Sequence, residues 1–295
     1  MSDYGHDPTE TSIPYRAFKK AGFEVHFATE NGKTPECDKK MLRGVTQKLL
    51  VSASSLFTSI LSMHAEDVHP IQGATSQVVK AYDAMAVTPE FTTPLSWSSP
   101  TFSLSSYNLI FLPGGHEKGV RQLIDSPVMA DHLASYFPQT VKPSTKNVAA
   151  VCHSVLALAV AKLSDGENMG KSILHECDTT ALPGTFEGVA FWGTRLFLGD
   201  YYKTYGVGSD SVETAVSAAV APLYCDMPAN RPLRCGKCST ILISSIKTAL
   251  GRIRKFINIS AFQMISGPRL ADLLDLLSRT RSTSTIMLVR DSLET

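Results

Sequence analysis

The sequence predicts an α/β fold with a doubly wound, mostly parallel sheet and helices on both faces. Three observations indicate it. Apolar runs at 107–112 and 147–151 are typical of buried strands, each run is followed by helical spacing, and an alternating strand at 23–29 follows a helix. Such alternation of strands and helices is typical of a parallel sheet that is covered on both faces.

The first element is predicted to be a helix from Asp7 to Gly22. Asp7 is a favourable capping residue, Pro8 fits the first helical turn, and the apolar residues that follow recur at helical spacing until Gly22. Residues 23–29 then alternate apolar and polar side chains and end at a turn. This second pattern predicts a strand.

The order of strand, turn and helix then occurs twice. The apolar run at 107–112 ends in a proline–glycine turn, and helical spacing follows over 120–136. The run at 147–151 ends at a cysteine, and an Ala- and Leu-rich segment at 153–163 follows it. Both segments are predicted to be strand–helix units of one sheet.

Polar groups follow three predicted strands, at the sheet edge where ligands of such folds gather. They are Glu30, the turn Gly114-Gly115-His116, and Cys152. On a strand-to-helix turn, a thiol faces the positive end of the helix, which favours the thiolate. His153 and the turn amides supply a proton acceptor and oxyanion donors. The alternative is that Cys152 is a small buried core residue.

Composition excludes several classes of protein. The 295 residues are 43% hydrophobic and 19% charged, as in globular proteins. A net charge of +1 gives no long-range field for nucleic acid or acidic lipid, so neither partner is expected. No signal peptide or long apolar run is present, and the six cysteines lack regular spacing. These features predict a cytoplasmic protein and leave a nuclear location open.

The charge divides the chain into two parts. Residues 222–295 hold 11 Lys and Arg against 5 Asp and Glu, so residues 1–221 are net acidic. We predict an α/β domain at 1–221 with an atypical insertion at 51–72, and a divergent basic tail at 222–295 without a recognisable domain. A single CxxC at Cys235–Cys238 lacks a second ligand pair, so no metal site is expected there.

Two motifs carry a family resemblance. The segments 109–116 and 149–156 resemble the paired signatures of the ThiJ/PfpI superfamily, also called class I glutamine amidotransferase-like proteins. The resemblance covers residues 3–50 and 73–220 and implies a flavodoxin-like fold. Four further segments resemble a fungal branch near glutathione-independent glyoxalase III and related heat-shock chaperones. These segments are 27–33, 118–122, 180–183 and 199–206.

The resemblance also implies a catalytic set. Cys152 would be the nucleophile, with His153 beside it and Glu30 as the carboxyl that approaches the thiol. Glu187 is the candidate for orienting the histidine. The oxyanion and substrate-binding candidates are Gly114, Gly115 and His116, although a solvent-exposed turn histidine is an alternative for His116.

The implied reaction converts methylglyoxal, a 2-oxoaldehyde, to D-lactate without a metal, cofactor or glutathione. Two alternatives stay open: another Cys-dependent hydratase or hydrolase of the superfamily, and a stress-related chaperone or non-catalytic member. The resembling family commonly forms homodimers. Its members also begin with an apolar strand in the sheet interior, whereas this sequence starts at the loop 4–7, so the first strand is predicted to be missing.

Overall fold

The computed structural model describes residues 1–50, 52, 73–141, 143–177, 179 and 181–220, together with the backbone of 240–243 and 287–290. Nearly all of the predicted insertion at 51–72 and the CxxC at Cys235–Cys238 lie outside the described residues.

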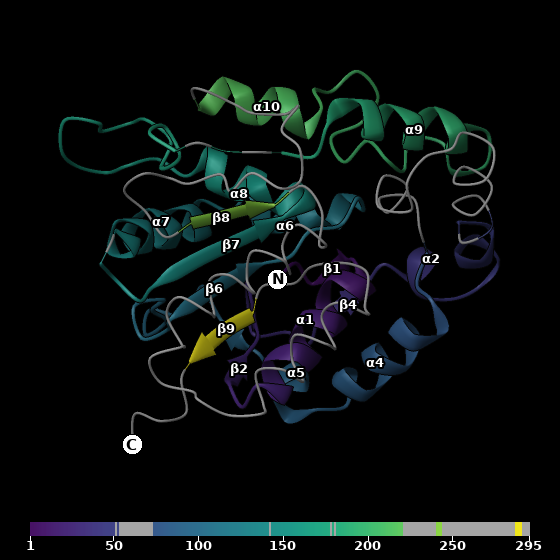
Figure 1. Cartoon of the computed structure of the whole chain (residues 1–295), viewed down its shortest axis with the longest axis horizontal. Coiled ribbons are helices and arrows are strands. Elements are labelled where there is room, and N and C mark those ends of the chain that lie inside the picture. Colours follow the sequence, from purple (N-terminus) through teal and green to yellow (C-terminus); the bar gives the residue numbers. More distant parts are fainter. Residues whose placement is uncertain are drawn as a thin grey trace.

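A five-stranded sheet forms the centre of the fold, in the order β2-β9-β6-β7-β8 (Figure 1). β6 and β7 are parallel, β7 and β8 are parallel, and β9 is antiparallel to both of its neighbours, β2 and β6. The strands are β2 (Glu24–His26), β6 (Leu109–Leu112), β7 (Asn147–Val151), β8 (Thr240–Ile243) and β9 (Met287–Arg290). The sequence prediction of an α/β fold is confirmed.

The interior position of the sheet is occupied by β9. This strand pairs Val289 with Val25 of β2 on one side and with Leu109 of β6 on the other. An amino-terminal strand, β1 (Tyr4–His6), is present but pairs with β4 (Glu36–Cys37) in a separate two-stranded sheet. Within the described residues, β9 (Met287–Arg290) therefore takes the interior position of the sheet, and β1 lies outside the central sheet.

Helix α1 (Pro8–Lys20) begins and ends where the sequence predicts. The Asp7 carboxylate accepts hydrogen bonds from the backbone N–H groups of Thr9 and Glu10, which caps the helix. At the other end Gly22 has a φ of +88°, a conformation that glycine adopts without strain. The helix packs against α4 (Ser76–Ala86) and β2.

The strand–helix units differ from the predictions in detail. Residues 120–136 form two helices, because Ser126 caps a new helix that starts at Pro127. The strand predicted at 23–29 divides into β2 and β3 (Ala28–Thr29), and β3 pairs with β5 (Leu95–Ser96). The other helices are α2 (Lys39–Leu42), α5 (Pro89–Thr92), η2 (Lys118–Val120), α6 (Arg121–Ile124), α7 (Pro127–Tyr136), η3 (Phe137–Thr140), η4 (Cys152–Ser154), α8 (Val155–Val160), α9 (Gly184–Leu198) and α10 (Val212–Ala219).

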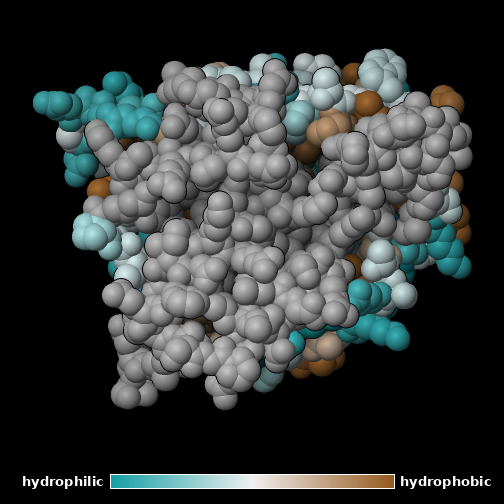
Figure 2. Space-filling view, in the orientation of Figure 1, coloured by the Kyte–Doolittle hydropathy of each residue, from teal (hydrophilic) through white to brown (hydrophobic). Residues whose placement is uncertain are grey.

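The core lies between the sheet and these helices. All five residues of β7 are buried, and α8 behind it packs against α7 and α10. On the outside, α9 exposes Trp192, Leu196 and Phe197, and hydrophobic atoms show along the edge of the molecule in Figure 2 where Figure 1 places this helix. None of the described helices is both long and apolar enough to cross a membrane.

Candidate active site

Cys152 occupies a sharp turn between β7 and η4. Its φ of +53° is the one positive value at a non-glycine position within the described segments. This backbone turns the side chain out of the strand direction, as in the strand-to-helix elbow of nucleophilic enzymes. The thiol is nevertheless buried, with 6% of the residue exposed.

The glycine turn after β6 lies directly against this cysteine. A Cβ atom added at Gly114 would lie 2.9 Å from the Cys152 Cβ and 2.9 Å from the Val151 carbonyl oxygen. At Gly115, which has a φ of +145°, an added Cβ would lie 2.6 Å from the Gly5 carbonyl oxygen. Both positions therefore require glycine, because real side chains do not make such short contacts.

Three of the predicted residues form a connected chain. The Cys152 Sγ lies 3.3 Å from Nδ1 of His153, and Nε2 of His153 lies 3.2 Å from Oε1 of Glu187. Glu187 is held in turn by the backbone N–H of Val212, which donates to Oε2 at 2.9 Å. His153 and Glu187 are both buried. This is the order of groups that a base-activated nucleophile requires.

A second carboxyl group lies near the thiol, and it comes from α1. Glu10 is buried, and its Oε2 accepts a 3.1 Å hydrogen bond from the backbone N–H of Gly114. Among charged groups, Glu10 has the largest effect on Cys152, and it raises the pKa of the thiol. Glu10 is absent from the site predicted from the sequence, because it follows the capping Asp7 by three residues and fits the first turn of a helix.

Glu30, the carboxyl that the resemblance assigns to this position, has a different partner. Its Oε2 accepts a 2.7 Å hydrogen bond from Nε2 of Gln122. The strand before Glu30 breaks into β2 and β3, and β3 pairs with β5 outside the central sheet. The end of β3 therefore does not share the sheet edge on which the prediction depended.

Burial is the main influence on the ionisation of the site. It raises the pKa of Cys152 well above the usual range, with Glu10 as the next cause, while the His153 backbone N–H lowers it. The helix expected to favour the thiolate consists of a 3-10 turn and the short α8. A thiol in this state needs an adjacent base to become a nucleophile.

His116 lies in the site and is buried, so the alternative of an exposed turn histidine is wrong. Its ring centroid lies 5.2 Å from that of His153 and 4.7 Å from that of Tyr202. Both His116 Nδ1 and the Tyr202 hydroxyl are buried without a hydrogen-bond partner in the described part of the structure. Unpaired polar atoms beside a nucleophile are available to a bound molecule.

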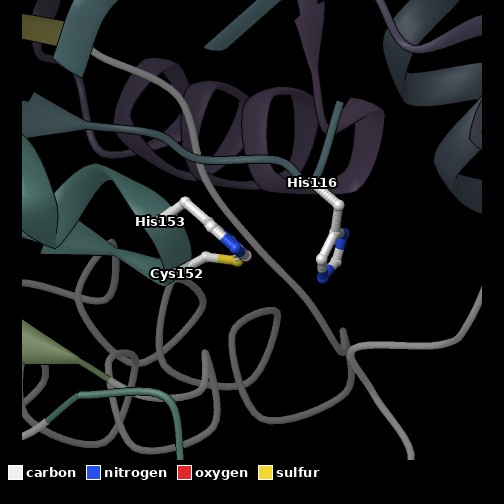
Figure 3. A group of neighbouring side chains, drawn as sticks. All are labelled: His116, Cys152 and His153. Atoms are coloured by element: carbon white, nitrogen blue, oxygen red, sulfur yellow. Dashed lines mark hydrogen bonds between the residues drawn. The ribbon is translucent and has the colours of Figure 1, made fainter. Parts of the chain in front are cut away.

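Figure 3 shows the side chains of His116, Cys152 and His153 directed toward one space. One donor atom from each lies within 4.8 Å of the others, so the group can also hold a metal ion. The site therefore combines a buried cysteine, a histidine held between the thiol and a carboxylate, and unpaired polar groups around them.

Two curated proteins of Schizosaccharomyces pombe are similar to this chain, and both are uncharacterized. One is 28% identical over 159 residues, which are 54% of this chain and 51% of that protein. The other is 20% identical over 149 residues, which are 48% and 41% of the two lengths. The chain thus spans about half the length, or less, of the curated relatives it matches.

The fold also has a counterpart of known structure. The crystal structure of a protein described as APC35852 matches with a TM-score of 0.54 at 17% identity, over 88% of this chain and 90% of that one. At this identity the likeness concerns the fold alone. A family model for the ThiJ/PfpI family-like proteins matches residues 1–216, which include the cysteine elbow, the glycine turn and Glu187. The chain belongs to the ThiJ/PfpI-like family.

Proposed function

We propose that the chain converts methylglyoxal to D-lactate without glutathione, in a glyoxalase III-like reaction with Cys152 as nucleophile. The observation that carries the proposal is the connected chain of Cys152, His153 and Glu187 at a strained elbow. Family membership supports cysteine-dependent chemistry, and the buried polar groups of His116 and Tyr202 suit a small polar substrate.

The reaction begins with removal of the thiol proton by Nδ1 of His153, 3.3 Å from the sulfur. The sulfur then bonds to the aldehyde carbon C1, and the aldehyde oxygen takes up a proton to give a hemithioacetal. Glu187 stabilises the positive charge on His153 during this step. The positive charge would otherwise be costly, because the site is buried.

A proton next leaves C1 and is delivered to C2, and the hydroxyl proton on the C1 oxygen passes to the C2 oxygen. C1 thereby becomes a thioester carbonyl and C2 an alcohol carbon. Glu10 and His153 are the acid–base candidates for this transfer, with Glu10 in the role that the resemblance gave to Glu30. Water then attacks the thioester, the C1–S bond breaks, and lactate leaves while the thiol regains its proton. The sum is methylglyoxal plus water giving lactate, without oxidant or cofactor.

The test incubates purified full-length protein with methylglyoxal in the absence of glutathione and measures D-lactate with a stereospecific assay. Wild type should produce D-lactate, and Cys152→Ala should lower the rate by at least ~10³-fold. Cys177→Ala, which changes another buried cysteine, should retain the activity. Absence of lactate from the wild type, or equal rates with Cys152→Ala, contradicts the proposal. Turnover of amides or other carbonyl compounds instead would favour the second cysteine-dependent alternative.

A chaperone activity is the second candidate, and the exposed face of α9 is the observation that favours it. Trp192 is 68% exposed and Leu196 is 101% exposed, which is unusual for large apolar side chains grouped on one helix. Suppression of the thermal aggregation of a client protein should then survive Cys152→Ala and fall with Trp192→Gln plus Leu196→Gln. Loss of suppression with Cys152→Ala alone speaks against this second role.

A further inference from the structure

The cysteine site contains the donor atoms of a transition-metal site. It offers one thiol sulfur and two imidazole nitrogens, from Cys152, His153 and His116, all within 4.8 Å of one another. Zn²⁺ binds sulfur and nitrogen ligands at about 2.3 and 2.0–2.1 Å, so neighbouring donors of a tetrahedral ion lie ~3.5 Å apart. The Cys152 Sγ and His153 Nδ1 already lie 3.3 Å apart. The donor atom of His116 lies within 4.8 Å of both.

The orientation of His153 is that of a metal ligand. Its Nδ1 faces the sulfur, while its Nε2 faces Oε1 of Glu187 at 3.2 Å. Metal-binding histidines almost always have their second nitrogen on a carboxylate or carbonyl, which fixes the tautomer and raises the basicity of the ligand. Glu187 is itself fixed by the Val212 N–H, so this outer partner is in place before any ion binds.

His116 supplies the independent indication of a ligand. The residue is 3% exposed, and its Nδ1 has no hydrogen-bond partner within the described residues. Its ring centroid lies 5.2 Å from that of His153, so the unpaired imidazole stands beside the other two donors. An incompletely paired imidazole is costly in such a place, and a bound cation offsets that cost.

The charge of the surroundings also suits a cation. Two buried carboxyl groups border the site: Glu187 lies 3.2 Å from Nε2 of His153, and Glu10 is bonded to the backbone N–H of Gly114. Acidic groups around the donor atoms favour a bound positive ion. Sulfur and imidazole nitrogen select zinc-like ions over Mg²⁺ and Ca²⁺, which prefer oxygen ligands.

We propose that His116, Cys152 and His153 bind Zn²⁺ or a similar thiophilic divalent cation, and that this ion inhibits the enzyme by occupying its nucleophile. On binding, the Cys152 S–H bond breaks, its proton passes to solvent, and the sulfur bonds to the metal. The fourth tetrahedral position stays open to water. The inhibitory effect rests on the proposed function, whereas binding of the ion does not.

Binding is tested with Co²⁺ as the probe, since a cobalt–thiolate bond gives a charge-transfer absorption. The full chain is used in a Cys225→Ser/Cys235→Ser/Cys238→Ser background, so that the CxxC thiols do not contribute. One equivalent of Co²⁺ should give the band, Cys152→Ser should abolish it, and His116→Gln should weaken binding. Glu187→Gln should raise the Kd by about 10–100-fold. Cys177→Ser is the matched control and should retain the band.

Two results overturn the metal site: no charge-transfer band in the background protein, or a band unchanged by Cys152→Ser. Circular dichroism of each variant verifies that it is folded. In a separate arm, added Zn²⁺ should inhibit D-lactate formation and EDTA should restore it. If the metal-free protein forms no lactate at all, the proposed function fails while the cobalt result still decides the site. Full activity of the Zn²⁺-loaded protein overturns the inhibitory role.

Discussion

The geometry of Cys152 is imposed by its neighbours. A positive φ costs a non-glycine residue roughly 1–2 kcal/mol, so the surrounding structure has to hold it in place. Gly114 does this by lying against the Cys152 Cβ and the Val151 carbonyl, while its own N–H is bonded to Glu10. The glycine turn, the elbow and α1 thus form one packed unit.

Replacing Gly114 by alanine tests this packing. The new Cβ would meet both the Cys152 Cβ and the Val151 oxygen at 2.9 Å, so the elbow has to shift. We expect Gly114→Ala to lower the free energy of unfolding by about 1–3 kcal/mol and to impair D-lactate formation. Urea unfolding and the lactate assay measure the two effects.

Gly188→Ala is the matched control for that change. Gly188 lies inside α9, and an added Cβ there meets nothing within 4 Å. Alanine should therefore stabilise the protein by about 0.5–1 kcal/mol through its higher helix propensity. Equal behaviour of the two alanine variants would show that the contact at Gly114 does not constrain the elbow.

The two candidate carboxyls can be separated by a pair of substitutions. Glu10→Gln keeps the hydrogen bond to Gly114 but removes the acid–base group, so the rate of lactate formation should fall by about 10²–10⁴-fold. Glu30→Gln preserves a partner for Gln122 and should leave the rate near that of the wild type. The comparison uses kcat at saturating methylglyoxal. A larger loss of kcat with Glu30→Gln than with Glu10→Gln would assign the acid–base role to Glu30.

For single residues, the sequence could indicate Cys152 and His153 as the candidate nucleophile and base, because both come directly after one apolar strand. Glu187 came from the family resemblance, and the structure places it next to His153. Glu10 could not be recognised in the same way, since its contact with Gly114 joins residues that are far apart in the chain. Its position three residues after the capping Asp7 is also typical of an ordinary first helical turn.

Two strands of the central sheet, β8 and β9, come from the carboxyl-terminal part of the chain, and β9 lies in its interior. β9 separates β2 from β6 and pairs with both, as Val289 pairs with Val25 and Leu109. Without β9, the facing backbone groups of β2 and β6 would lose their partners at about 1–3 kcal/mol for each buried group. An element outside the family match therefore completes the core of the family fold.

A proline in β9 is expected to open the sheet. Both edges of this strand are paired, so Val289→Pro removes a ladder hydrogen bond whichever side its N–H faces. We expect a loss of about 3 kcal/mol or more in the free energy of unfolding and faster amide exchange in β2 and β6. Ser292→Pro, beyond β9, is the control. Unchanged exchange in β2 and β6 of Val289→Pro would mean that β9 does not hold them together.

Element boundaries followed local signals where such signals existed. The cap at Asp7 and the stop at Gly22 predicted α1 well, whereas Pro127 divides a segment whose apolar spacing looks continuous. The role of β9 could not be predicted from the sequence. The pairing of Glu24 with Arg290 joins residues far apart in the chain, and no pattern within either strand indicates its partner.

The stability of the whole molecule should depend on pH through a buried histidine. Burial lowers the pKa of His6 to about 3, far below its ordinary value of 6.5. Below pH 6.5 the unfolded chain binds a proton that the folded protein excludes, so stability falls as the pH decreases from 6.5 toward 3. Between pH 7 and pH 5 the loss is about 2 kcal/mol for this one group.

His6→Gln should remove that part of the pH dependence, as measured by urea unfolding at pH 7 and pH 5. Glutamine retains a polar group near the Tyr82 hydroxyl, which lies 3.5 Å from the His6 Nε2. The pKa of the neighbouring Asp7 is raised by burial, which favours folding at lower pH, but this contribution is present in both proteins. Parallel pH profiles of the two proteins would contradict the assignment to His6.

The arrangement of β9 has a consequence for the order of events during synthesis. All proposed catalytic residues leave the ribosome long before Met287–Arg290, yet the sheet that positions them is closed by that late segment. Pairing of Glu24 with Arg290 also closes a very long loop, and such contacts form slowly. The nascent protein therefore holds an unpaired gap between β2 and β6 until Met287–Arg290 have been synthesised, and open strand edges of this kind favour intermolecular pairing in that interval.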